Sequence, residues 1–146
     1  MTINIVIGPG YGDTQPIQEL IYSSQNKMHL IRDQHNLCPF ILKADIVISA
    51  AGRTAYEIAA TGTPAILIPT INHEKKTALA LRDLSCALYI DPCKKNFKQN
   101  IINQTIELVS NHKLRQSLSD SALKIINTSG AYRVAKNILV YLDNGS

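Results

Sequence analysis

The feature that most constrains the fold is an alternation of short, unbroken apolar runs with segments whose apolar residues recur at helical spacing. A run that is apolar at every position fits a strand buried on both faces, as in a parallel sheet. We expect strands at residues 3–7, 28–31, 45–49, 65–68 and 87–90. We expect helices at residues 15–24, 37–42, 54–60 and 73–84, with two or three more between 97 and 142. This order predicts an α/β fold, a Rossmann-like three-layer domain with a mostly parallel sheet of about five or six strands.

The length and composition of the chain favour one folded domain over residues 1–146. Hydrophobic residues make up 45% of the sequence and charged residues 18%, a balance typical of globular rather than disordered proteins. The sequence has no Trp and few aromatic residues, so we expect an aliphatic core. No internal repeat, linker or low-complexity tract divides the chain, and one core is sufficient at this length.

Charge is spread along the sequence rather than concentrated in one segment. The 15 Lys and Arg residues exceed the 11 Asp and Glu residues by four, and the nearest approach to a cluster is Lys94, Lys95 and Lys98. Proteins that bind nucleic acids usually gather basic side chains on one face and add stacking aromatic rings. We therefore expect no nucleic-acid partner, and a phosphorylated small molecule suits the modest positive excess better.

The sequence carries no sign of a membrane span, a leader peptide, a disulfide framework or a metal site. No apolar run reaches the length that crosses a bilayer, and no basic segment followed by an apolar one begins the chain. The three cysteines are scattered, without a C-x-x-C pair. We expect a soluble cytoplasmic protein with no metal and no cofactor, while a peripheral membrane contact stays open.

The first of three loops that follow predicted strands is rich in glycine. Open parallel sheets bind ligands at the carboxyl ends of their strands, so such loops are the natural candidates for a site. Gly8 and Gly10 fit two positions of the G-x-G-x-x-G fingerprint of dinucleotide-binding proteins, but Asp13 occupies the third. Asp33 lies about where a ribose-binding acid would lie, so a nicotinamide- or flavin-dependent dehydrogenase stays an alternative. The simpler interpretation is a turn whose backbone closely approaches a neighbour.

The second loop, Ser49 to Thr54, has the form of an anion site. It joins a predicted strand to a helix expected to begin near Thr54, so free backbone N–H groups and the positive end of the helix dipole come together. Gly52 lets a ligand come close, while Arg53 and the Thr54 hydroxyl add donors for a phosphate. Thr54 and Glu57 also have the spacing of a capping box, in which both side chains only satisfy N–H groups of their own helix. The spacing leaves both interpretations open.

The third loop, residues 69–76, is polar and leads into a helix. Asn72 can act there as a simple N-cap, and Lys75 and Lys76 can form a solvated face. His73 has no visible Asp or Ser partner in the sequence, so we do not expect it to be a catalytic base. The sequence therefore identifies no catalytic residue.

A longer string around the second loop resembles a known family. Residues 44–65 read A-D-I-V-I-S-A-A-G-R-T-A-Y-E-I-A-A-T-G-T-P-A. This string is similar to the C-terminal domain of GT-B nucleotide-sugar enzymes of the glycosyltransferase family 28 type. The group includes the peptidoglycan N-acetylglucosaminyltransferase, spore-coat polysaccharide glycosyltransferase-like proteins and the UDP-sugar hydrolase of pseudaminic acid synthesis. Residues 8–10 and 50–54 look closest to the spore-coat type.

The resemblance implies that the chain binds a nucleotide-sugar, with UDP as the expected nucleotide. It implies that the second loop faces the diphosphate, that a glutamate accepts hydrogen bonds from the ribose hydroxyls, and that the third loop lies near the sugar or the base. Two glycines of the first loop would line the cleft opposite. The implied nucleotide-sugar-binding residues are Gly8, Gly10, Ser49, Gly52, Arg53, Thr54, Glu57, Asn72 and His73.

The chain departs from the family pattern in two respects. Several relatives place a pair of amide side chains in the third loop to hold the donor sugar, whereas residues 73–76 read H-E-K-K here, so the donor sugar stays open. GT-B enzymes also close an N-terminal domain over this one, and that half supplies the acceptor site and usually the catalytic base. We expect an N-terminal domain or a partner subunit to complete the site. A nucleotide-sugar hydrolase and a non-catalytic interaction domain stay alternatives.

Overall fold

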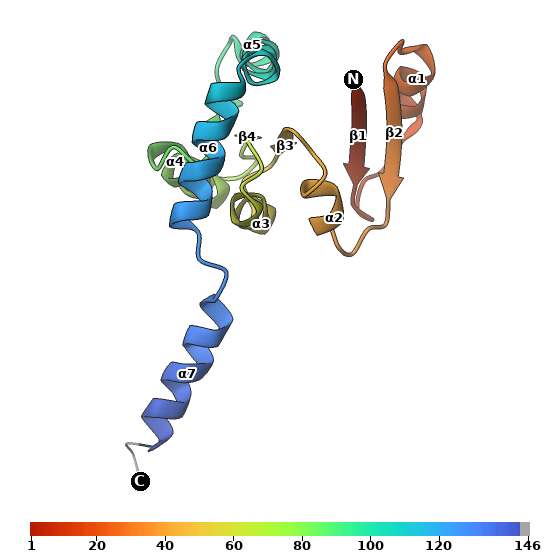
Figure 1. Cartoon of the computed structure of the whole chain (residues 1–146). Helices are drawn as coiled ribbons and strands as arrows, with labels where there is room; N and C mark the ends of the chain where they lie inside the picture. Colours follow the sequence, from red (N-terminus) through yellow and green to blue (C-terminus); the bar gives the residue numbers. More distant parts are fainter. Residues whose placement is uncertain (144–146) are drawn as a thin grey trace. The chain divides into compact units, whose positions relative to one another are not determined.

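The computed structural model describes residues 1–143, and its strands and helices follow the order predicted from the sequence (Figure 1). Every strand pair is parallel, and helices separate the strands along the chain, which confirms the α/β class. Contacts within the chain divide it into two compact units, residues 1–37 and the segment from Cys38 onward. That residues 1–146 act as one domain stays a prediction.

The first unit consists of two parallel strands and the helix that connects them. Strand β1 (Thr2–Ile7) pairs with β2 (Lys27–Arg32) along the whole length of both strands. Helix α1 (Gln15–Ser23) lies between them in the sequence. Exposed and more buried side chains alternate along β1, so Ile3, Ile5 and Ile7 share its more buried face.

The second unit contains a three-stranded parallel sheet and six helices within residues 38–143. The strands are β3 (Val47–Ser49), β4 (Ala65–Leu67) and β5 (Leu88–Tyr89), in the order β3-β4-β5. The helices are α2 (Cys38–Ile41), α3 (Arg53–Thr61), α4 (Asn72–Asp83), α5 (Phe97–Ser110), α6 (His112–Ile125) and α7 (Gly130–Asp143). Each strand is shorter than its apolar run, because ladder pairing covers only the residues that have a partner in register.

The prediction of one sheet with five or six strands differs from the structure. The hydrogen-bonded strands form a two-stranded sheet, β1-β2, and a three-stranded sheet, β3-β4-β5. The alternation of strands and helices predicts that strands run parallel. It does not predict which strands are neighbours, because adjacency depends on backbone pairing between segments that are distant in the sequence.

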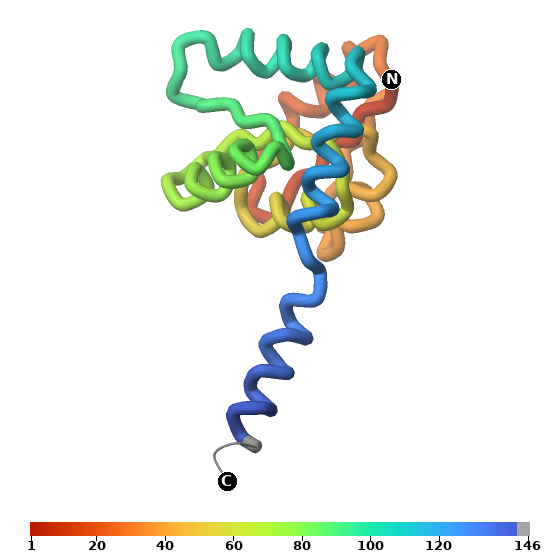
Figure 2. Tube along the Cα trace, turned by 60° about the vertical axis from the view of Figure 1, so that its left-hand side comes forward, coloured from red at the N-terminus to blue at the C-terminus, as the bar shows by residue number. Residues whose placement is uncertain are grey.

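The core of the second unit is aliphatic, as the composition predicts. Ile66 of β4 and Ile90 beyond β5 pack with Leu108 of α5 and Leu118 of α6, and all four are at most 4% exposed. Figure 2 shows the sharp turn of the chain between α5 and α6. Asn111 in that turn caps α6 by accepting a backbone N–H of the helix at 3.0 Å. Because α6 also packs on α3, the C-terminal helices support the helix that follows the second loop.

Helix α3 ends at Gly62, two residues beyond the end of the range expected from the sequence. Gly62 takes the left-handed conformation, with φ of 68°, and the N–H groups of Gly62 and Thr63 donate to the carbonyls of Ala59 and Ile58. This is a common way for a helix to end. A Cβ on Gly62 would lie 2.7 Å from the Cγ of Leu123 in α6. Conformation and packing therefore both require glycine here.

Helix α7 is amphipathic. Val134, Ile138 and Leu142 recur at helical spacing, yet all side chains of residues 131–142 are exposed. Within residues 1–143, no helix combines the length and the apolar character needed to cross a membrane.

Candidate functional site

The carboxyl ends of three strands bring the second and third loops together. Ser49 of β3 lies opposite Leu67 of β4, which in turn lies opposite Tyr89 of β5. Because these strands run parallel, the segments that follow them emerge at one edge of the sheet. The predicted site residues of the second unit gather at this edge, and we call residues 49–57, 69–76 and 89–91 the strand-end site.

The start of α3 presents backbone donors at the strand-end site. Gly52 is the N-cap, Arg53 is the first helical residue, and the Ala55 N–H donates to the Gly52 carbonyl at 3.1 Å. No side chain within the described part of the chain caps this helix. The first N–H groups of α3, which have no partner inside the helix, are thus suited to hold an anion.

The capping-box interpretation of Thr54 and Glu57 is wrong. Helix α3 begins one residue earlier than predicted, so Gly52 takes the N-cap position and Thr54 is the second helical residue. A capping box needs Thr at the N-cap and Glu three residues later. Glu57 is instead exposed, one turn into the helix, while Ser49 and Thr54 are half-buried. Arg53 is also exposed, and since it precedes Glu57 by four residues, both project from the same side of α3.

Asn72 and His73 are the first two residues of α4, and both are exposed. The N-cap of α4 is Ile71, so the expectation that Asn72 caps this helix is wrong. The helix begins earlier because the backbone before it is held by Glu74, whose carboxylate reaches back to Thr70. Asn72 and His73 are therefore free of a capping role at the strand-end site.

Glu74 is a residue of this site that the sequence analysis did not identify. Its side chain is only 8% exposed, and its Oε2 accepts hydrogen bonds from the Thr70 N–H at 2.7 Å and the Thr70 hydroxyl at 2.8 Å. A Cβ built on Gly52 would lie 3.2 Å from Oε1, so the carboxylate lies against the start of α3. The Thr70 N–H lowers the pKa of Glu74 more than burial raises it. The carboxylate is thus ionised at neutral pH.

Lys75 joins the start of α4 to the end of β5. Its Nζ lies 3.3 Å from Oδ2 of Asp91, and this hydrogen bond raises the pKa of Lys75. The Cys93 N–H donates to the other carboxylate oxygen at 3.0 Å and is the main cause of the lowered pKa of Asp91. Both Lys75 and Lys76 are exposed, as the sequence predicts, and Lys75 is also one half of an ion pair.

Gly8 and Gly10 lie in the first unit, in the turn that follows β1, where the Tyr11 N–H donates to the Gly8 carbonyl at 3.1 Å. Neither glycine has a positive φ, and a Cβ built on either would meet no atom of this unit within 4 Å. The close backbone approach expected for this turn is therefore not found within the unit. The position of both glycines opposite the second loop stays a prediction.

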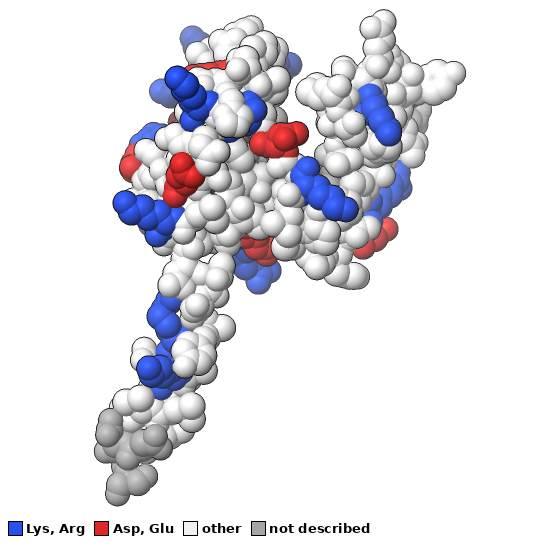
Figure 3. Space-filling model, viewed as in Figure 1, with Lys and Arg blue, Asp and Glu red and all other residues white. Residues whose placement is uncertain are grey.

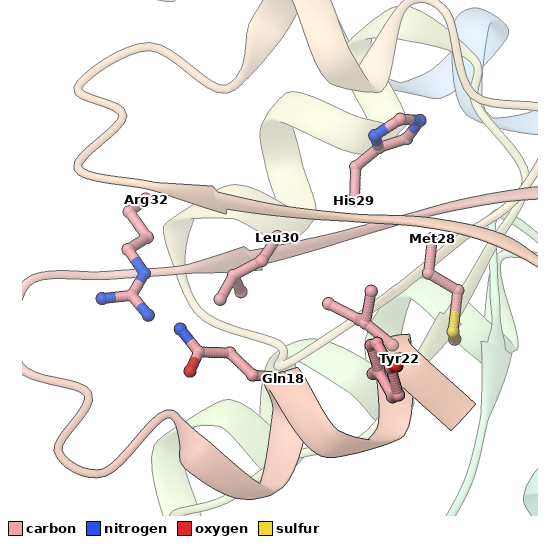
Figure 4. A pocket seen from close by; sticks show the side chains of 7 residues that line it. Gln18, Tyr22, Met28, His29, Leu30 and Arg32 are labelled. Atoms are coloured by element: carbon pink, nitrogen blue, oxygen red, sulfur yellow. The ribbon is translucent and has the colours of Figure 1, made fainter. Parts of the chain in front are cut away.

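The first unit also has an open hollow of about 610 Å³ between α1 and β2. Figure 4 shows Gln18 and Tyr22 of α1 on the side of the strand where Leu30 and Arg32 of β2 lie. None of the predicted site residues lines this hollow. The hollow and the predicted site therefore do not coincide.

Potential metal ligands are not clustered in the described part of the chain, and charged side chains are dispersed on the face that Figure 3 shows. On the face shown in Figure 3, Lys and Arg side chains are scattered and interspersed with Asp and Glu, in agreement with the dispersed charge of the sequence. Within the 143 residues described, no three His, Cys, Asp or Glu side chains are grouped to hold a metal ion. The groups that the strand-end site presents to an anion are therefore backbone N–H groups, a guanidinium and hydroxyls.

Comparison with known sequences gives a match to the model of one family, the glycosyltransferase family 28 C-terminal domain, over residues 2–138. Spore coat polysaccharide biosynthesis protein SpsG of Bacillus subtilis strain 168 is 24% identical over 126 residues, which cover 84% of this chain and 37% of that protein. A UDP-N-acetylglucosamine–N-acetylmuramyl-(pentapeptide) pyrophosphoryl-undecaprenol N-acetylglucosamine transferase of Phocaeicola vulgatus is 31% identical over 105 residues, 68% of this chain and 27% of that protein.

Solved structures share the fold. MurG of Acinetobacter baumannii superposes with a TM-score of 0.77 at 18% identity, over 95% of this chain and 41% of that one. WaaG, a glycosyltransferase involved in lipopolysaccharide biosynthesis, gives a TM-score of 0.67 at 16% identity, over 92% of this chain and 36% of that one. The chain thus has the Rossmann-like fold of the C-terminal halves of GT-B glycosyltransferases and spans less than half the length of these relatives. From its sequence match and its fold, the chain belongs to the family of glycosyltransferase family 28 C-terminal domains.

Proposed function

We propose that this domain binds the diphosphate of a nucleotide-sugar, with UDP as the nucleotide, and holds the donor for glycosyl transfer. The observation that carries the proposal is the start of α3, which follows β3 at the strand-end site and has no side-chain cap among the described residues. Family membership supports a nucleotide-sugar as the anion, since the name of one relative includes UDP-N-acetylglucosamine.

In the proposed complex, the first turn of α3 stabilises the departing diphosphate. Negative charge grows on the diphosphate as the bond from its oxygen to the sugar C1 breaks. N–H groups that are already fixed in place stabilise such charge without reorganising during the reaction. The N–H groups of Gly52, Arg53 and Thr54 take this role, together with the Arg53 guanidinium, and Ser49 lies at the base of the turn.

The nucleoside extends from this turn along α3. Arg53 and Glu57 project from the same side of the helix and are about 6 Å apart along its axis, since the helix rises about 1.5 Å per residue. A ligand whose diphosphate contacts Arg53 can thus place its ribose hydroxyls against the Glu57 carboxylate. Asn72 and His73 face the sugar or the base.

The complete reaction needs a second half in this proposal. The chain spans 37% and 27% of the lengths of the two curated relatives. An N-terminal domain or a partner subunit supplies the acceptor site and the catalytic base, so the domain alone binds the donor but turns it over poorly. We place this activity in the cytoplasm, where the scattered cysteines stay reduced.

The proposed function is tested by isothermal titration of the chain with UDP. We expect saturable binding, because the ligand supplies both the diphosphate and the ribose that the strand-end site accommodates. NAD is titrated in parallel, and binding of NAD but not UDP would instead support a dehydrogenase. Absence of UDP binding at millimolar concentration, in protein shown to be folded by circular dichroism, contradicts the proposal. Product analysis with the completed assembly then separates a transferase from a hydrolase.

The Glu57→Ala substitution is expected to weaken UDP binding at least about tenfold, since a hydrogen bond to a charged group contributes about 1.5–3 kcal/mol. Binding of inorganic pyrophosphate, which lacks a ribose, should change little. Titration of both ligands measures the difference, and Glu107→Ala on α5, another exposed glutamate, serves as the control. An equal loss for UDP and pyrophosphate would contradict a ribose contact at Glu57.

A further inference from the structure

A fixed negative charge lies directly beside the proposed diphosphate position. Glu74 is 8% exposed, its Oε2 is occupied by the N–H and hydroxyl of Thr70, and its Oε1 is the atom that a Cβ on Gly52 would meet at 3.2 Å. The pKa of Glu74 is lowered, mainly by the Thr70 N–H, so the carboxylate is ionised at neutral pH. An anion at the start of α3 therefore meets attraction from the helix N–H groups and repulsion from Glu74.

With this arrangement, the affinity of the site for a ligand depends on the charge of the ligand's terminal phosphate. A terminal phosphate that is free carries about −1.5 to −2 charges at neutral pH, because its second pKa is about 6. A terminal phosphate esterified to a sugar has lost that second ionisation and carries a single negative charge. The free nucleoside diphosphate is thus repelled by Glu74 more strongly than the nucleotide-sugar.

We propose that Glu74 is a specificity-determining residue that favours the esterified diphosphate of the donor over the free nucleoside diphosphate at the strand-end site. This inference rests on the proposed function. During transfer an acceptor hydroxyl, which this domain does not supply, forms a bond to the sugar C1 and loses its proton to a base. The bond from C1 to the diphosphate oxygen breaks, its electron pair stays on that oxygen, and the product gains negative charge next to Glu74. The same carboxylate therefore favours release of the product after transfer.

The test compares UDP with its β-methyl ester, two ligands that differ in terminal charge but not in nucleoside. In the wild-type chain we expect UDP to bind no more tightly than the ester, although an anion site without Glu74 would favour the more charged ligand. The Glu74→Gln substitution should tighten UDP about tenfold and the ester about threefold, the effect expected when the charges are several ångströms apart and water screens them. Glutamine keeps an oxygen that can accept the Thr70 N–H. Isothermal titration gives all four dissociation constants.

Two further variants separate charge from structure. Glu74→Asp keeps the charge and should keep the wild-type ratio of the two dissociation constants. Asp83→Asn removes an equal charge from the exposed end of α4, about 13 Å along the helix from Glu74, and should leave the ratio unchanged.

The outcomes distinguish the inference from the proposed function. Two results overturn charge selection by Glu74 without contradicting the proposed donor site. One is an equal change in affinity for UDP and the ester in folded Glu74→Gln. The other is UDP binding tenfold tighter than the ester in the wild type. If the wild-type chain is folded and binds neither ligand, the proposed function fails and the inference fails with it. The wild-type comparison keeps the inference testable even where Glu74→Gln does not fold.

Discussion

The Gly62→Ala substitution is expected to lower the free energy of unfolding by about 2–5 kcal/mol. Gly62 has φ of 68°, and a side chain in the left-handed region costs about 1–2 kcal/mol. The new Cβ would also lie 2.7 Å and 2.9 Å from carbons of Leu123 and 2.9 Å from the Ser119 hydroxyl, all on α6. Displacing packed side chains in this way adds about 1–3 kcal/mol. Urea denaturation monitored by circular dichroism measures the loss.

A matched control is available in the same unit. Gly130 at the start of α7 has no positive φ, and a Cβ there would meet only the Arg133 guanidinium, at 3.8 Å. Gly130→Ala should therefore leave the unfolding midpoint close to that of the wild type. A Gly62→Ala variant that unfolds at the wild-type urea concentration would mean that α3 and α6 do not pack as described.

The end of α3 shows which parts of the fold can be predicted from local sequence. Gly62 stops the helix because glycine tolerates a positive φ, which is a property of that one residue, so the sequence is sufficient to place it. Local sequence does not predict which strands share a sheet. The runs around Val47, Ala65 and Leu88 are identifiable as strands, but their pairing into a sheet separate from β1 and β2 depends on contacts between distant segments.

The candidate site also has parts that local sequence predicts and parts that depend on contacts between distant segments. The anion-binding form of residues 49–54 follows from a strand, a glycine and a helix start in succession, which is a local pattern. Thr54 and Glu57 were ambiguous because a shift of one residue in the helix start decides whether Thr54 is the N-cap. Glu74 could not be assigned to the site, because its contact with Gly52 joins two loops 22 positions apart. The one local indication was an acid in the first turn of a helix, which is common at helix starts.

The Gly52→Val substitution is expected to weaken UDP binding at least about hundredfold and to leave the chain folded. Gly52 has φ of −78° and ψ of −152°, an extended conformation that other residues adopt, so the backbone tolerates the change. A Cβ there is already 3.2 Å from Oε1 of Glu74. We expect the two Val methyl groups to occupy the space over the first N–H groups of α3. Loss of two hydrogen bonds to a charged ligand, each about 1.5–3 kcal/mol, corresponds to a loss of that size.

Two variants show whether filled space over α3 causes the loss. Gly52→Ala adds only the Cβ and should lose less than about tenfold in UDP affinity, since no atom then covers the N–H groups. Gly130→Val adds the same side chain outside the strand-end site and should bind UDP like the wild type. Titration is paired with thermal denaturation, so that loss of binding is separated from loss of fold. Wild-type affinity in a folded Gly52→Val variant would show that UDP binding does not depend on the space over the first turn of α3, which contradicts the proposed diphosphate position.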